Sequence, residues 1–156
     1  MSRTDRASLL LHVGRAAVYA ALVDPDALIR WLPPTGMHGH FEQFDLREGG
    51  SWRMVLTYDD PTGTPGKTSA AADVSEIRIV RLVPDERIVQ HVDFETAAVE
   101  FRGTMEMEWS LRSVSEGTEV TIEARNVPAG ITARDHAAGM ASSLANLAAY
   151  LEPSDT

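Results

Sequence analysis

The segment His38-Gly39-His40-Phe41-Glu42 places two imidazoles and a carboxylate at alternate positions. On a regular β-strand such positions share one face, and two histidines with a carboxylate can hold Zn²⁺ with one coordination position open. Gly39 argues against this site, because a glycine within a strand often marks a bulge. The alternative is a set of polar side chains where a loop enters a strand. We therefore predict no metal site, and we keep His40 as a polar group that could contact a ligand.

Three other residues could supply acid–base chemistry. His136 lies near the start of a helix, where the helix dipole disfavours a protonated imidazole. It could bind a polar group of a ligand or act as a weak general base, or it could satisfy a loop carbonyl. Glu76 and Asp73 would be candidate acids or bases if they faced an apolar interior, but a β-bulge would turn Glu76 to the other face of its strand.

Other functional classes find no support in the sequence. It contains no Ser-His-Asp order, phosphate-binding loop or dinucleotide glycine pattern, and no cofactor is expected. The net charge of -9 over 156 residues disfavours binding to nucleic acid and to anionic lipid surfaces. No apolar stretch is long enough to insert into a membrane. The absence of cysteine fits a cytoplasmic protein.

The apolar periodicity predicts one α+β domain over residues 1–156. Two short helices follow a first strand, and the second of them is capped by Asp24 and begins at Pro25. A period of two then continues to about residue 125, and one long helix ends the chain. The predicted strands are 7–13, 39–46, 51–58, 71–83, 86–94, 101–114 and 119–127; the helices are 14–24, 25–32 and 135–152; and 59–69 is a loop.

The last helix raises the question of whether the interior is packed or hollow. Its apolar stripe is rich in alanine, whereas the sheet would face it with methionine and tryptophan. Either these groups interdigitate at ordinary packing density, or the curved sheet holds the helix away and leaves a pocket. The periodicity alone does not distinguish the two. The stripe is Ala133, Ala137, Met140, Leu144, Leu147, Ala148 and Leu151, with His136, Ser143 and Tyr150 along one edge.

Five segments carry a family resemblance by their order and spacing. They are VYAALVDPDALIRWLPP, FDLREGGSWRM, VPDERIVQHVDF, GTMEMEWSLRSVSEGTEVTIEARNVPAGI and DHAAGMASSLANLAAYLE, within a core of about residues 7–152. Together they resemble the START-like (SRPBCC) superfamily of helix-grip domains, and within it the branch named after the activator of heat-shock protein 90 ATPase. The resemblance implies a seven-stranded antiparallel sheet gripping the C-terminal helix, with an apolar cavity between them.

The resemblance also implies a range of activities. Members of the superfamily bind lipids, polyketides or other apolar molecules, some cyclise or hydrolyse them, and a few act on a chaperone. Our leading hypothesis is the binding of a small apolar ligand. The predicted ligand-binding residues are Trp31, His40, Trp52, Met54, Leu56, Tyr58, Glu76, Met105, Met107, Trp109, His136, Met140, Ser143 and Leu144.

Two alternatives remain open at this point. A cyclase or hydrolase would need an acid–base group inside the cavity. A chaperone-linked interaction module would need an apolar patch on the outer face of the sheet, where the residues are charged. The sequence also lacks the separate N-terminal domain of full co-chaperone activators, so a chaperone partner is not expected. A homodimer is left open.

Overall fold

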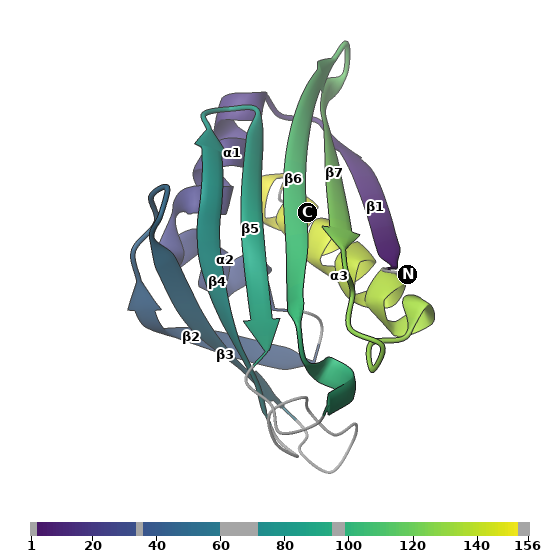
Figure 1. The fold of residues 1–156 in the computed structure, drawn as a ribbon. Coiled ribbons are helices and arrows are strands. Elements are labelled where there is room, and N and C mark those ends of the chain that lie inside the picture. The colour runs from purple at the N-terminus through teal and green to yellow at the C-terminus, as the bar shows by residue number, and fades with distance from the viewer. Residues whose placement is uncertain (1–2, 34–35, 60–71, 95–98, 153–156) are drawn as a thin grey trace.

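The computed structural model describes residues 3–33, 36–59, 72–94 and 99–152. Seven strands form one antiparallel sheet in the order β1-β7-β6-β5-β4-β3-β2, and the helices lie on its inner side (Figure 1). The elements are β1 (Thr4–Leu11), α1 (Arg15–Val23), α2 (Pro25–Trp31), β2 (Met37–Phe44), β3 (Ser51–Tyr58), β4 (Ala72–Val83), β5 (Arg87–Phe94), the 3-10 turn η1 (Val99–Phe101), β6 (Thr104–Val114), β7 (Gly117–Arg125) and α3 (Ala133–Leu151). The predicted α+β helix-grip fold is confirmed.

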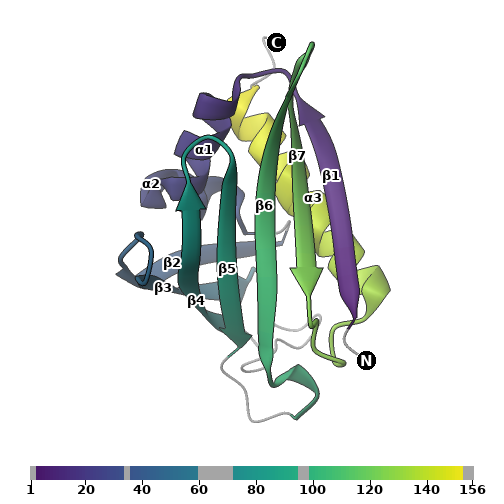
Figure 2. The same cartoon turned by 45° about the horizontal axis from the view of Figure 1, so that its top comes forward.

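The sheet has two chemically different faces because buried and solvent-facing residues alternate along its strands. In β7, for example, every second residue from Thr118 to Ala124 is buried. Figures 1 and 2 show the sheet curling, so that β2 and β3 run across the direction of β5 and β6. The register shifts once within β2 and once within β4, and such irregularities increase local twist. The curl gives the sheet a concave inner face.

Short-range signals set the local turns as the sequence predicts. The Asp24 side chain accepts a hydrogen bond from the Asp26 amide at 3.0 Å, and Pro25 occupies the first helical position of α2. Between β2 and β3 the chain turns at Gly50. A Cβ there would lie 2.3 Å from the carbonyl oxygen of Asp45, so only glycine fits this turn.

The first strand begins earlier than predicted. It covers Thr4–Leu11 rather than 7–13, because it pairs with β7 along its whole length. Periodicity favoured the apolar run, but pairing with a neighbouring strand also extends over polar residues. The pairing puts Asp5 opposite Ala124, on the inner face of the sheet. The loop predicted at 59–69 lies outside the described residues apart from Asp59.

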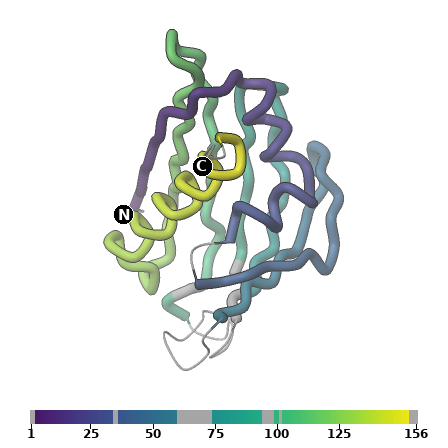
Figure 3. The backbone as a smooth tube through the Cα atoms, turned by 180° about the vertical axis from the view of Figure 1, so that it is seen from behind, coloured from purple at the N-terminus to yellow at the C-terminus, as the bar shows by residue number. Residues whose placement is uncertain are grey.

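Helix α3 packs against β1, α1 and α2, and Figure 3 shows it lying across the inner side of the sheet next to β1. Thr132 caps its start by accepting a hydrogen bond from the Asp135 amide at 3.0 Å. Its buried face differs from the predicted stripe. Ala133 and Ala137 are exposed, whereas His136 is turned inward. The buried residues of the helix are Met140, Ser143, Leu144 and Leu147.

Candidate functional site: a cavity between the sheet and the C-terminal helix

A cavity of about 630 Å³ lies between the inner face of the sheet and the helices α2 and α3. Its wall is mainly apolar and comes mostly from β3, β4, β5, β6 and the two helices, with smaller contributions from α1, β2, β7 and the segment before α3. Most of the residues predicted to contact a ligand lie in this wall: Trp31, Trp52, Met54, Leu56, Tyr58, Met105, Met107, Trp109, His136, Met140 and Ser143. The fold therefore brings together side chains that are separated by more than a hundred positions in the sequence, as Trp31 and Ser143 are.

The buried apolar side chains of the interior form two clusters rather than one. The first joins α1, α2 and α3 to β1 and to the ends of β6 and β7 that lie near them. The second joins β3, β4, β5 and β6 to the segment between β7 and α3. Met107 is half-buried and packs against both clusters. Since α3 rests on β1 at one edge of the sheet, the middle strands face it across the cavity.

One row of residues on the inner face of the sheet leads from the edge strand β1 to Met107 and Gln90 in the cavity wall. The strand register aligns Asp5 of β1, Ala124 of β7, Met107 of β6 and Gln90 of β5. Asp5 and Gln90 are thus separated by three strand spacings, or about 14 Å perpendicular to the strands. The row has polar side chains at both ends, Asp5 and Gln90, and the small Ala124 and the flexible Met107 lie between them.

Three predicted site residues lie elsewhere. His40 pairs with Val55 and Glu76 pairs with Arg53, on the outer face of the sheet, and both side chains are exposed. The period of two puts every second residue outside, and sequence alone did not settle which set of β4 residues faces inward. Leu144 is 2% exposed and belongs to the first packed cluster instead of the cavity wall.

The other residues considered as acids or metal ligands also lie apart from the cavity wall. His38 Nδ1 is 2.8 Å from Asp59 Oδ1, and Arg53 donates to Glu42 at 2.7 Å. In the parts of the chain that the structure describes, no three side chains of metal-binding type come together. The side chain of Asp73 lies outside those parts.

Aromatic side chains form two stiff parts of the wall. Trp31 is 1% exposed, donates from Nε1 to the carbonyl of Ala21 at 2.9 Å, and meets Trp109 edge-on at 5.6 Å between ring centroids. On the opposite side Trp52 meets Phe41 edge-on at 5.1 Å. Edge-on ring contacts of this kind stabilise a fixed arrangement, so these walls keep their shape while the methionines between them can adapt.

Gln90 is a polar residue that the sequence analysis missed. It occupies an inner position of β5 between Ile88 and Val92 and is 8% exposed. Within the described residues its amide has no hydrogen-bond partner, and it borders the cavity. Burying an amide in an apolar wall costs free energy unless the amide forms a hydrogen bond. The signal was available, because a glutamine interrupts the apolar alternation of this strand.

The Ser143 hydroxyl, by contrast, already has a partner. It donates to the carbonyl of Leu32 at 3.1 Å, and Asn146 donates to the carbonyl of Pro33 at 2.9 Å. These two bonds fix the end of α2 against α3. Ser143 borders the cavity, but its proton is committed to the fold, so it can offer a ligand only its oxygen.

His136 and Asp5 form a hydrogen-bonded pair at the β1 side of the cavity. His136 Nδ1 lies 2.7 Å from Asp5 Oδ2, and the two side chains are only 12% and 10% exposed. Arg3 holds the same carboxylate, with Nε 3.1 Å from Oδ1 and Nη2 3.0 Å from Oδ2. Arg3 also donates to the carbonyl of Ile131. No sequence motif indicated the pair, whose members are 131 positions apart.

The contacts of the pair determine whether Asp5 is ionised and which ring nitrogen of His136 donates to it. Burial by itself raises the pKa of the Asp5 carboxyl, but hydrogen bonds from His136 and Arg3, together with the charge of Arg3, outweigh it. The pKa of Asp5 is thereby lowered below its ordinary value of 3.8. Asp5 is ionised at neutral pH and can only accept hydrogen bonds. Nδ1 of His136 must therefore carry a proton, and in the neutral ring Nε2 has the free lone pair.

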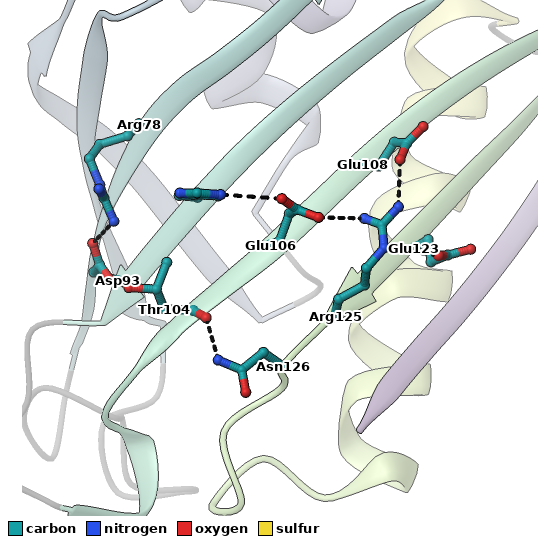
Figure 4. Close-up of polar contacts among 9 residues, drawn as sticks. Arg78, Asp93, Thr104, Glu106, Glu108, Glu123, Arg125 and Asn126 are labelled. Atoms are coloured by element: carbon teal, nitrogen blue, oxygen red, sulfur yellow. Dashed lines mark hydrogen bonds and ion pairs between the residues drawn. The ribbon is translucent and has the colours of Figure 1, made fainter. Parts of the chain in front are cut away.

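The outer face of the sheet carries a network of ion pairs, shown in Figure 4. Arg125 lies at its centre, 3.0 Å from Glu106, 2.5 Å from Glu108 and 3.2 Å from Glu123. The large apolar side chains that are exposed in the described structure belong to five different elements and form no group on this face: Leu9, Ile29, Val80, Val99 and Tyr150. The network makes the outer face strongly polar.

The activator of Hsp90 ATPase homolog 1-like family has a sequence model that matches residues 12–152. The chain belongs to this family. The match runs from the residue that follows β1 to the end of α3, and it agrees with the SRPBCC-type fold. A search of curated proteins found no match. Among the helices of the described residues, none is both long and apolar enough to cross a membrane.

Solved structures of similar proteins support the family assignment. A protein of Chromobacterium violaceum is 30% identical, with a TM-score of 0.85 and coverage of 97% of this chain and 98% of that one. The AHSA1-like protein of Aeromonas hydrophila is 19% identical, with a TM-score of 0.72 and 99% of both chains covered. DynU16, from the dynemicin biosynthetic locus, is 22% identical, with a TM-score of 0.69, and 96% of this chain matches 47% of that one.

Proposed function

We propose that this AHSA1-like protein binds a small apolar molecule, of lipid, polyketide or aromatic type, in the cavity between the sheet and α3. The observation that carries the proposal is the cavity itself: about 630 Å³ of space in a mainly apolar wall. Volumes of this size are typical of small-molecule sites. A fold neighbour from the dynemicin locus adds support for a natural product as ligand.

Apolar contacts alone would bind such a ligand weakly. Burying roughly 300 Å² of apolar surface is worth about 7 kcal/mol, and the loss of free motion on binding offsets at least about 4 kcal/mol of it. The remainder corresponds to a dissociation constant in the millimolar range. Useful affinity therefore needs polar contacts, and Gln90 and His136 are the wall residues best placed to make them.

Mass spectrometry of the protein purified under native conditions tests the proposal directly, since a retained ligand would appear as an added mass. A titration with the neutral apolar fluorophore N-phenyl-1-naphthylamine then locates the binding site. Met107→Trp fills the middle of the cavity and should weaken binding by about tenfold, or 1.4 kcal/mol. Arg112→Trp, on the outer face of the same strand, is the matched control. Equal affinities for the two variants would place binding outside the cavity.

A second candidate function is an enzyme, a cyclase or hydrolase acting on such a ligand. The observation that favours it is that a histidine oriented by a buried carboxylate borders the cavity. A chaperone-linked interaction module receives no comparable support, because the outer face of the sheet is covered with ion pairs. Turnover of candidate esters, compared between the natural protein and His136→Gln, separates binding from catalysis.

A further inference from the structure

The pair of His136 and Asp5 sets the kind of polar group that can enter the cavity. Asp5 accepts from Nδ1 of His136 at 2.7 Å, so Nε2 is the ring atom left to meet a ligand. Arg3 binds both oxygens of Asp5. It stabilises the carboxylate without entering the cavity wall. The imidazole of His136 is thereby oriented by the carboxylate of Asp5, whose negative charge is balanced by Arg3.

The charges around the pair disfavour a ligand that is already an anion. The described wall of the cavity contains no lysine or arginine, and its other ionisable side chain near His136 is the acidic Asp135. The segment 126–132, which runs from β7 to α3, has no charged residue. Arg3 is engaged by Asp5 and by the carbonyl of Ile131. A neutral group that donates a proton fits Nε2 better than a carboxylate or phosphate does.

We propose that His136 Nε2 takes the proton of an acidic hydroxyl, a phenol or an enol, on an otherwise apolar ligand in this cavity. The O–H bond breaks, its electron pair stays on the oxygen, and the proton forms an N–H bond at Nε2. The resulting imidazolium lies between the new oxyanion and Asp5, so no net charge enters the site. This inference rests on the proposed binding function and names the substrate class for it.

The rest of the molecule offers a matched control for this chemistry. His12 is also paired with a carboxylate, with Nδ1 2.9 Å from Glu152 Oε1. Its side chain is 64% exposed and lies outside the cavity wall. If orientation by a carboxylate alone were sufficient, both histidines would act alike. The proposal assigns the proton transfer to His136 because only that pair borders the apolar space.

The test uses 7-hydroxycoumarin, whose neutral and ionised forms have different excitation spectra, and its methyl ether 7-methoxycoumarin. At a pH where free 7-hydroxycoumarin is mostly neutral, the natural protein and His12→Gln should shift the bound dye toward the anion. His136→Gln keeps a donor for Asp5 but lacks the base. It should lose the anion band even at saturating 7-hydroxycoumarin. Its affinity for 7-methoxycoumarin measures how much binding the substitution costs apart from proton transfer.

A measurement on the natural protein covers the case in which His136→Gln fails to fold. Nitrogen NMR of the imidazoles should show Nε2 of His136 becoming protonated on addition of 7-hydroxycoumarin and remaining unchanged with 7-methoxycoumarin.

The outcomes separate the inference from the proposed function. If 7-methoxycoumarin binds but bound 7-hydroxycoumarin stays neutral, or if His136→Gln retains the anion band, the proton-transfer inference is wrong and the binding proposal stands. If neither dye binds, binding of aromatic ligands is refuted, and this inference is refuted with it.

Discussion

Met107 and Glu108 are neighbours in β6, yet they belong to opposite environments. Met107 borders the cavity on the inner face, whereas Glu108 contributes to the ion pairs around Arg125 on the outer face. The inner face leaves space unfilled, and the side-chain amide of Gln90 has no hydrogen-bond partner there among the residues that the structure describes. The outer face shows the reverse pattern, with charged groups paired across neighbouring strands.

This difference indicates how the fold tolerates a hollow interior. The two packed clusters on either side of the cavity provide most of the apolar burial. The outer ion pairs contribute little to stability, because partly exposed pairs are screened by water and salt. The inner face is thus divided between packed clusters and unfilled space, and substitutions on the two faces should have different consequences.

The largest expected effect is at Trp31. Trp31→Ala removes a side chain that is 1% exposed and its contact with Trp109, and it should lower the free energy of unfolding by about 3–5 kcal/mol. Ile29→Ala, on the same helix but 39% exposed, should change it by less than about 0.5 kcal/mol. Urea denaturation measures both. If Trp31→Ala lowered the free energy of unfolding as little as Ile29→Ala does, this part of the wall would not belong to the packed core.

The next effect is at Asp5 and depends on pH. Asp5→Asn should lower the free energy of unfolding by about 1.5–3 kcal/mol at neutral pH, the range for hydrogen bonds to a charged group. Because the folded state lowers the pKa of Asp5, its contribution is fully present above the unfolded-state value. It is lost as the pH falls through the lower folded-state value.

Denaturation curves measured at several pH values check this prediction. The stability gap between the natural protein and Asp5→Asn should be constant above about pH 5 and should narrow in more acid solution. Asp45→Asn removes a carboxylate from a more exposed pair with Arg47 and serves as control. A gap that widened in acid would contradict the lowered pKa.

On the outer face, Arg125→Met should lower the free energy of unfolding by about 1 kcal/mol or less. It removes the cation that three glutamates share, and the remaining repulsion between them should weaken as salt is added. Arg112→Met, which affects one exposed pair with Glu119, should have a smaller effect. Stability measured at low and high salt tests this, and a salt-independent loss would argue against an electrostatic cause.

The smallest effect is expected where the inner face is hollow. Met107→Trp should lower the free energy of unfolding by well under about 1 kcal/mol, because the larger ring enters the cavity. Leu111→Trp, on the same face of β6 but 6% exposed and within a packed cluster, should cost about 1–3 kcal/mol. Thermal denaturation compares them. Equal losses would show that the interior near Met107 is already filled.

Much of the fold followed from short-range patterns. The strand predicted at 51–58 is β3 to the residue, and the alternation of β6 placed Met105, Met107 and Trp109 on the cavity side. The errors lie where alternation leaves the choice of face open, as at Glu76, or where apolar content suggested burial, as at Ala137. Gln90 was within reach of the same pattern and was overlooked.

The sequence by itself determined which segments are strands and helices and which residues share a face, because periods of two and 3.6 are properties of the local backbone. Only the tertiary structure decided that the interior is hollow, since the distance between α3 and the middle strands depends on how the whole sheet curls. It alone also joined Asp5 to His136, because these residues meet only once β1 has paired with β7, the strand that leads into α3.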